Sequence, residues 1–323
     1  MFLLKKCQKE FERCFFIGQR GNKALKKCSI AKRNNASKEQ EELELAFRKP
    51  QEIAQVTIDS GTYKAAMPVK NMLALGFLGG AFIAIGYLLD IRVIANLPHE
   101  WGTFGTFLGA AVFPLGLILI LLAGGELLTG NMTAISMASL AKKVTVKMLL
   151  KNWFWITLSN FVGALFVAYF FGHIVGLTET GPYLDKTVAV AGAKLDAGFW
   201  AAFFSGIGCN WLVGLAVWLS YGASDMTGKV LAIWFPIMGF VAIGFQHVVA
   251  NMFVIPAAIF AGYYTWGAYF ANFVPVYLGN AVGGGVFVAL IYWMSYKDSL
   301  KKSAAQPEDQ FSKASAKKRA ASK

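Results

Sequence analysis

"GFQHVVANMFVI", residues 244–255, places a glutamine, a histidine and an asparagine inside a stretch that is otherwise apolar. A second stretch, "LLTGNMTAI" at residues 127–135, contains the same Asn-Met pair followed by apolar residues. Polar backbone and side chains at membrane depth are tolerated where they line a cavity or are buried in protein. Each Asn-Met pair is therefore predicted to lie where a membrane-spanning helix is interrupted.

The composition places both stretches in a membrane protein, since 56% of the 323 residues are hydrophobic and 15% are charged. The apolar residues form six runs that are long enough to cross about 30 Å of hydrocarbon. They cover residues 71–89, 104–141, 153–176, 198–220, 230–261 and 268–294. The second and fifth runs are too long for one plain span. We predict an all-α polytopic membrane protein with six transmembrane helices, of which helices 2 and 5 are interrupted.

The two Asn-Met pairs divide these spans into two repeats. Because each group contains three spans, an odd number, the second group enters the membrane from the opposite side, which predicts two inverted three-helix repeats. Gly124 and Gly244 supply backbone freedom at the two breaks. The small-residue pairs Gly76–Gly80 and Gly279–Gly283 predict close contact between neighbouring helices.

Lysine and arginine are unevenly distributed among the loops. Fifteen precede the first span, four lie between spans 2 and 3, one lies between spans 4 and 5, and eight follow the sixth. The alternate loops hold one, two and none. By the positive-inside rule, both termini are predicted to be cytoplasmic, in a plasma (inner) membrane. The net charge of +13 is explained by this bias and by attraction to anionic lipid, so no nucleic-acid partner is expected.

Three regions are predicted along the chain. Residues 1–46 are read as a basic, disordered cytoplasmic extension, residues 47–297 as the membrane domain and residues 298–323 as a basic cytoplasmic tail. Pro50 followed by Glu52 predicts a short helix along the cytoplasmic surface. The cysteines form no CxxC pair, so neither a disulfide nor a metal site is expected, and no cofactor is predicted.

The only ionisable side chains that we expect well inside the spans are Glu126 and His247, one in each break. An ionisable group at membrane depth is a candidate for function. Two structural alternatives stay open. His247 could bridge two helices through hydrogen bonds, and Glu126 could cap the free amides of the half-helix that follows it.

The motifs "GGELLTGNM", "GIGCNWLVGLAVWLSY" and "GFQHVVANMFVIP", with the earlier "KPQEIAQ", resemble the formate/nitrite transporter family over about residues 47–297. The resemblance implies an aquaporin-like protomer and a homopentamer with one pore in each subunit. It implies passage of small monovalent anions such as formate, nitrite or hydrosulfide.

The resemblance also implies a set of pore residues. These are His247 at the centre, Thr129 in the first break, Asn210 and Asn251 near the pore, Lys194 in a positive vestibule, and an apolar constriction of Phe113, Leu117, Leu127 and Phe240. One position departs from the family pattern. Formate channels have a glutamate immediately before the histidine, whereas this chain has Gln246, which removes an acid beside His247.

We therefore expect a channel or transporter for small monovalent anions, formate first and nitrite next, with protons linked to transport through His247. A hydrosulfide or other weak-acid anion channel is the alternative within the family. A water or neutral-solute channel of the aquaporin type is the alternative outside it, but its Asn-Pro-Ala breaks and arginine filter are absent. An enzyme is not expected, because His99 and His173 lie at predicted membrane edges and complete no nucleophile or metal set.

Overall fold

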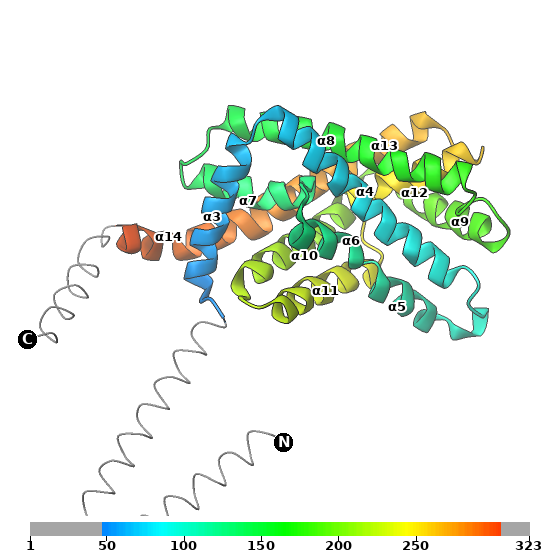
Figure 1. Ribbon diagram of the computed structural model, residues 1–323, viewed down its shortest axis with the longest axis horizontal. Coiled ribbons are helices and arrows are strands. Elements are labelled where there is room, and N and C mark those ends of the chain that lie inside the picture. The colour runs from blue at the N-terminus through cyan, green and yellow to red at the C-terminus, as the bar shows by residue number, and fades with distance from the viewer. Residues whose placement is uncertain (1–46, 305–323) are drawn as a thin grey trace, which may run out of the picture. The chain divides into compact units, whose positions relative to one another are not determined.

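The computed structural model describes residues 47–304, which contain helices and no strand. The elements are α3 (Pro50–Ala66), α4 (Val69–Ile94), η2 (His99–Trp101), α5 (Thr103–Val112), α6 (Leu115–Ile118), η3 (Leu119–Gly124), α7 (Leu128–Leu140), α8 (Val146–Phe166), η4 (Val167–Ile174), α9 (Pro182–Leu195), α10 (Phe199–Gly222), α11 (Met226–Ile243), α12 (Val248–Phe260), α13 (Trp266–Val282), η5 (Gly283–Leu290) and α14 (Ile291–Ala304). They are shown in Figure 1.

The predicted N-terminal extension, residues 1–46, lies outside the described residues, and so does the tail from residue 305 onward. Helix α14 continues to Ala304, beyond the predicted domain boundary at residue 297. The cysteines at positions 7, 14 and 28 also fall outside the described part, whereas Cys209 is a buried free thiol in α10.

Six helical segments of the described chain are long and apolar enough to cross a membrane, which confirms the predicted number of spans. They are Val69–Ile94, Thr103–Gly124, Val146–Ile174, Phe199–Gly222, Met226–Ile243 and Trp266–Leu300. The shorter apolar helices α7 and α12 complete the second and fifth runs after an interruption.

Both interruptions use the same backbone devices. Gly124 and Gly244 have φ angles of 104° and 88°, a left-handed region that favours glycine. The residues directly before α7 and α12, Leu127 and His247, are extended rather than helical. The chain therefore leaves one helix at a glycine, runs extended for a few residues and begins a new helix, as the sequence predicted for both breaks.

The predicted glycine contacts are confirmed at two helix crossings. A Cβ atom added to Gly80 in α4 would lie 1.9 Å from the carbonyl oxygen of Asn160 in α8. In the second half, a Cβ on Gly279 in α13 would lie 2.1 Å from the carbonyl oxygen of Phe203 in α10. At both crossings the backbones approach so closely that only glycine fits.

Helix α3 begins where the sequence predicted, with Pro50 in its first turn and the Lys49 backbone N–H donating to Glu52 Oε2 at 2.9 Å. It packs against α7, α10 and α14 (Figure 1). Part of its apolar side is covered, because Ile53 and Ile58 are buried and Gly61 lies against the carbonyl of Ala134. Helix α3 is thus built into the fold beside the first break.

Candidate functional site

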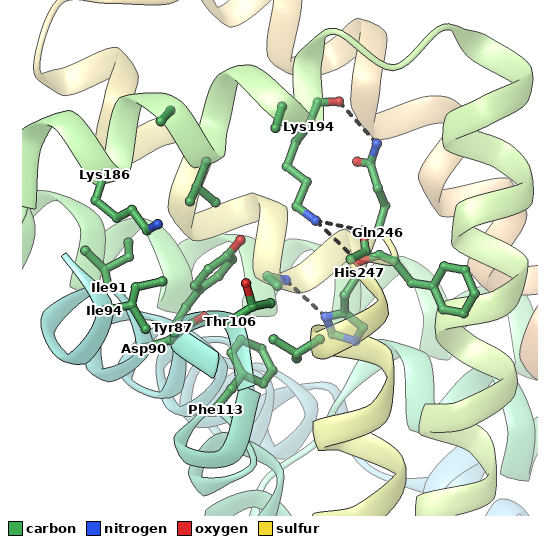
Figure 2. Close-up of a pocket in the computed structure, with 18 of the residues that line it drawn as sticks. Tyr87, Asp90, Ile91, Ile94, Thr106, Phe113, Lys186, Lys194, Gln246 and His247 are labelled. Carbon is green, nitrogen blue, oxygen red and sulfur yellow. Dashed lines mark hydrogen bonds between the residues drawn. The ribbon is translucent and has the colours of Figure 1, made fainter. Parts of the chain in front are cut away.

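A cavity of about 720 Å³ leads to the second break. Figure 2 shows Lys186 and Lys194 of α9 on one wall and Asp90 of α4 on another, with Gln246 and His247 below Lys194. Lys194 points toward the break, where its Nζ donates to the carbonyl oxygens of Gly244 at 3.3 Å and Phe245 at 3.4 Å. The cavity is therefore lined by cationic and polar groups that converge on His247.

A second and much smaller cavity, of about 10 Å³, lies at the first break and is lined by Lys64, Asn131 and Tyr221 among others. The four predicted constriction residues divide between the two cavities. Phe113 and Phe240 line the large one, Leu117 and Leu127 line the small one, and all four are buried. The rings of Phe113 and Phe240 meet edge to face with centroids 5.7 Å apart. Apolar side chains thus occupy both cavity walls next to the breaks.

His247 connects the two breaks. Its Nε2 lies 2.8 Å from Thr129 Oγ1, and its Nδ1 accepts a hydrogen bond from the backbone N–H of Ala250 at 3.1 Å. Because Nδ1 is an acceptor here, a neutral ring carries its proton on Nε2 and donates it to Thr129. His247 is the N-cap of α12, bridges two helices, as the structural alternative proposed, and also lines the large cavity.

The same hydrogen bonds recur in the two halves, and the asparagines and break residues that make them are offset by 120 residues. Asn160 Oδ1 accepts from the N–H of Leu128 at 2.9 Å, and its Nδ2 donates to the carbonyls of Gly76 and Glu126. In the second half, Asn280 makes the same three bonds to Val248, Gly206 and Gln246. One asparagine from the third span of each half therefore closes each break.

A second pair of asparagines repeats in the same way. Asn131 Nδ2 donates to Glu126 and to Asn152, while Asn152 Nδ2 donates to the carbonyl of Lys64. The equivalent bonds run from Asn251 to Gln246 and Asn272, and from Asn272 to the carbonyl of Lys194. Buried side-chain amides that bond to one another and to backbone carbonyls in this way hold the irregular backbone of each break in place.

The two halves differ at one charge. Lys64 Nζ lies 2.5 Å from Glu126 Oε1 and forms an ion pair with it. The equivalent residues in the second half are Lys194 and Gln246, and the neutral Gln246 cannot form such a pair. Burial alone would lower the pKa of Lys64, which lies outside the six spans, but Glu126 together with Tyr221 and Tyr63 outweighs burial and raises that pKa above its ordinary value. Burial lowers the pKa of Lys194, also outside the spans, below its ordinary value.

The remaining predicted pore residues lie beside these groups. Asn210 Nδ2 donates to the carbonyl oxygens of Thr129 at 3.2 Å and Asn280 at 2.7 Å. Asn251 and Gln246 line the large cavity. The predicted residues therefore gather around the two breaks, with Asn210 holding the first break to the sixth span.

Two expectations need correction. Glu126 does not cap the half-helix that follows it, because its carboxylate is bonded to Lys64 and Asn131 while Asn160 accepts from the first amide. Glu126 and His247 are also not the only ionisable groups inside the spans. Asp90 lies in α4, 5% exposed, on the wall of the large cavity. The first apolar run was predicted to end at residue 89, so Asp90 was placed outside the span.

Sequence reasoning also missed Lys64 and the four structural asparagines, Asn152, Asn160, Asn272 and Asn280. The sequence did contain a signal for these asparagines. Asn152 and Asn272, and likewise Asn160 and Asn280, are separated by 120 residues, as are Asn131 and Asn251. No comparable signal marked Lys64, because its partner Glu126 is 62 residues away in the chain.

Comparison with known proteins gives three findings. A family model described as formate/nitrite transporter matches residues 51–294. The chain is 62% identical over 264 residues to an uncharacterized transporter, YrhG, of Bacillus subtilis (strain 168), covering 81% of this chain and 99% of that protein. It is 58% identical over 253 residues to the formate channel BtFdhC of Bacillus thuringiensis, covering 78% of this chain and 97% of that protein.

A solved structure described as a pentameric formate channel with formate bound is similar in fold. The TM-score is 0.60 at 31% sequence identity, and the match covers 71% of this chain and 97% of that chain.

Proposed function

This chain belongs to the formate/nitrite transporter family, and from that membership we propose that it conducts formate through a pore between the two helix breaks. It is an integral membrane protein with six apolar spans in its described part. The observation that carries the proposal is the cavity of about 720 Å³, which leads past Lys194 to His247, the hydrogen-bond partner of Thr129. A cationic mouth that leads to a polar pair beside apolar side chains suits a small weak-acid anion.

The assembly and orientation belong to the same proposal. The protein forms a homopentamer with one pore in each subunit, supported by the pentameric formate channel of similar fold. The two halves are inverted copies, supported by the hydrogen bonds that recur after an odd number of spans. Both termini are cytoplasmic and the membrane is the plasma membrane, supported by the distribution of lysine and arginine.

The energetics favour a route in which the anion is neutralised during passage. Moving a bare carboxylate into an apolar constriction costs at least several kcal/mol. Protonating an acid with a pKa of about 4 at neutral pH costs about 3 pKa units, or about 4 kcal/mol. Transport coupled to a proton is therefore competitive with transport of the bare anion.

In this route the mouth of the large cavity and the narrow point of the pore have separate roles. Lys194 concentrates anions at the mouth of the large cavity. The Nε2–H of His247 and the hydroxyl of Thr129 provide hydrogen bonds at the narrow point, where Phe113 and Phe240 exclude hydrated ions. Direct proton transfer from His247 requires a new proton at Nδ1, which would displace the Ala250 N–H. A hydrogen-bonding role for His247 therefore costs less rearrangement than a proton-donating role.

Nitrite and hydrosulfide are the other candidate substrates, since both are small monovalent anions of weak acids. The test compares uptake of formate, nitrite and hydrosulfide into proteoliposomes that contain the purified full-length protein, at one acidic and one neutral pH. We expect formate uptake well above that of protein-free liposomes, and a rise in rate at the acidic pH. Formate uptake no faster than in protein-free liposomes, together with increased water or glycerol permeability, would overturn the proposal in favour of a neutral-solute channel.

A further inference from the structure

The two breaks share one hydrogen-bonded frame but carry different charges. Glu126 and Gln246 occupy equivalent places, since each accepts from the asparagine five residues later, at 2.8 Å in both halves. Lys64 and Lys194 also occupy equivalent places, because their backbone carbonyls accept from Asn152 and Asn272. Because these places are equivalent, the two breaks of one chain can be compared directly: the first has an acid, Glu126, where the second has an amide, Gln246.

The acid neutralises only one of the two lysines. Lys64 is paired with Glu126 at 2.5 Å. Among the residues that the structure describes, no carboxylate oxygen lies within 4.0 Å of Lys194 Nζ. Its ammonium group has two long hydrogen bonds to carbonyl oxygens, at 3.3 and 3.4 Å. An ammonium bonded only to neutral carbonyls keeps its attraction for an anion.

The two lysines also face cavities of different size. Lys194 lines the cavity of about 720 Å³, whereas Lys64 lines the cavity of about 10 Å³. The large cavity is also lined by one more lysine, Lys186, and by one carboxyl group, Asp90, so its lysines outnumber its carboxyl groups by one. An anion that enters the large cavity therefore meets a net positive site directly before His247.

We propose that the pore has one strong anion site, at Lys194, and that Gln246 is the residue that keeps this site strong. The inference rests on the proposed function, because it concerns the same pore and the same permeating carboxylate. On the Lys64 side the corresponding cation is neutralised by Glu126. The pore therefore half-saturates with formate at a lower concentration from the Lys194 side, by roughly five- to tenfold for one extra unit charge in a partly solvated site.

Passive transport places a strict condition on this asymmetry. Without an energy source, the ratio of maximal rate to half-saturating concentration must be equal in the two directions. The side with the lower half-saturating concentration therefore has the lower maximal rate. At low formate the two faces conduct equally, and the asymmetry is visible only as the pore saturates.

The experiment uses sealed right-side-out spheroplasts and inverted vesicles from the same expressing cells. Initial uptake of radiolabelled formate is measured against concentration, at equal pH on both sides and with the membrane potential collapsed. We expect half-saturating concentrations that differ by about fivefold or more between the two faces. Gln246→Glu should raise the lower value and leave the other face unchanged, because the new acid repeats the pairing of Glu126 with Lys64.

Three further variants make the test specific. Glu126→Gln should lower the half-saturating concentration only at the face opposite to the one that Gln246→Glu affects. If this variant folds poorly, the double variant Lys64→Met with Glu126→Gln replaces the pair by neutral groups and should leave unchanged the half-saturating concentration at the face that Gln246→Glu affects. Gln51→Glu makes the same chemical change as Gln246→Glu at an exposed position of α3 and should alter neither face.

The outcomes separate this inference from the proposed function. Absence of formate uptake from both faces would overturn the proposed function and the inference with it. Intact uptake with equal half-saturating concentrations would overturn the inference alone. A Gln246→Glu effect that is equal at both faces, or that Gln51→Glu reproduces, would also overturn it, because a general change in surface charge would then explain the data.

Discussion

Thr129 Oγ1 and His247 Nε2 lie 2.8 Å apart, and this hydrogen bond joins the first helix break to the second. The other ring nitrogen of His247 accepts from the N–H of Ala250, so the two partners together fix the tautomer of a neutral ring. The Thr129 hydroxyl, which accepts from His247, keeps its own proton for another acceptor. A permeating anion at this point would be such an acceptor.

The first prediction concerns His247. Replacement with phenylalanine removes both hydrogen bonds and should abolish proton-linked formate uptake, with a loss of about 1 kcal/mol in stability from the missing N-cap. Replacement with asparagine, a strong N-cap residue, should retain anion passage with an altered pH dependence, because asparagine cannot relay a proton. Uptake into proteoliposomes over a pH series measures both. Wild-type pH dependence in both variants would assign His247 a purely bridging role.

The second prediction concerns Thr129. The change Thr129→Val keeps the shape but removes the acceptor for His247 Nε2–H, and a buried donor without a partner costs about 1–3 kcal/mol. We expect a lower unfolding temperature in detergent and reduced formate uptake. Thr129→Ser restores the hydroxyl and serves as the control, with both properties near the wild type. Equal behaviour of the valine and serine variants would exclude a role for the hydroxyl.

A third prediction follows from the asparagines that close the breaks. Asn160→Leu removes an acceptor for Leu128 N–H and donors to two carbonyls, each a buried group that costs about 1–3 kcal/mol when unsatisfied. Asn280→Leu should cost a similar amount. Fluorescence-detected size-exclusion chromatography after heating reports the loss of folded protein. Asn96→Leu, at an exposed asparagine, is the control, and it should behave like the wild type.

Gly80 gives a fourth prediction. A methyl group at this position would collide with the carbonyl of Asn160, so Gly80→Ala should push α4 away from α8 and cost at least about 1–3 kcal/mol. Gly267→Ala is the matched control, because the nearest atom to its new Cβ would be 3.7 Å away. Thermal unfolding of the two variants in detergent compares them. Equal stability would show that the helices separate without cost.

The fifth prediction tests topology with a variant in which the four native cysteines are replaced. Cysteines introduced at Lys143 and Ser312 should react with a membrane-impermeant maleimide only in inverted vesicles. A cysteine at Thr180 should react only in intact cells, because Thr180 is exposed at the opposite end of the third span. Labelling of position 312 from outside the cell would contradict the predicted orientation.

The spans and breaks were predictable because each has a local signature. Apolar length marks a membrane-spanning helix, and the glycine before each polar stretch marks the interruption. The repeated Asn-Met pair placed Asn131 and Asn251 in corresponding positions, and the hydrogen bonds confirm that correspondence. Patterns of this kind depend on neighbours in the chain and so can be read without coordinates.

The charge arrangement could not be predicted in the same way. Lys64 lies in α3, for which the sequence predicted only a short surface helix starting near Pro50, and its pairing with Glu126 depends on how α3 packs against α7. Asp90 stands one residue beyond an apolar run, and only the packing of α4 shows that it is buried. The difference in size between the two cavities likewise depends on distances between helices, which no local pattern records.

The recurring hydrogen bonds have a consequence for biosynthesis. The hydrogen bonds that recur in the two halves use partners between Lys64 and Asn160 at the first break, and partners between Lys194 and Asn280 at the second. The ribosome therefore completes the first set before it translates any residue of the second, and domains generally fold in that order. A nascent chain paused after the third span can already satisfy its buried amides in the translocon. The bonds that Thr129 makes with Asn210 and His247 then form last, when the two finished halves meet.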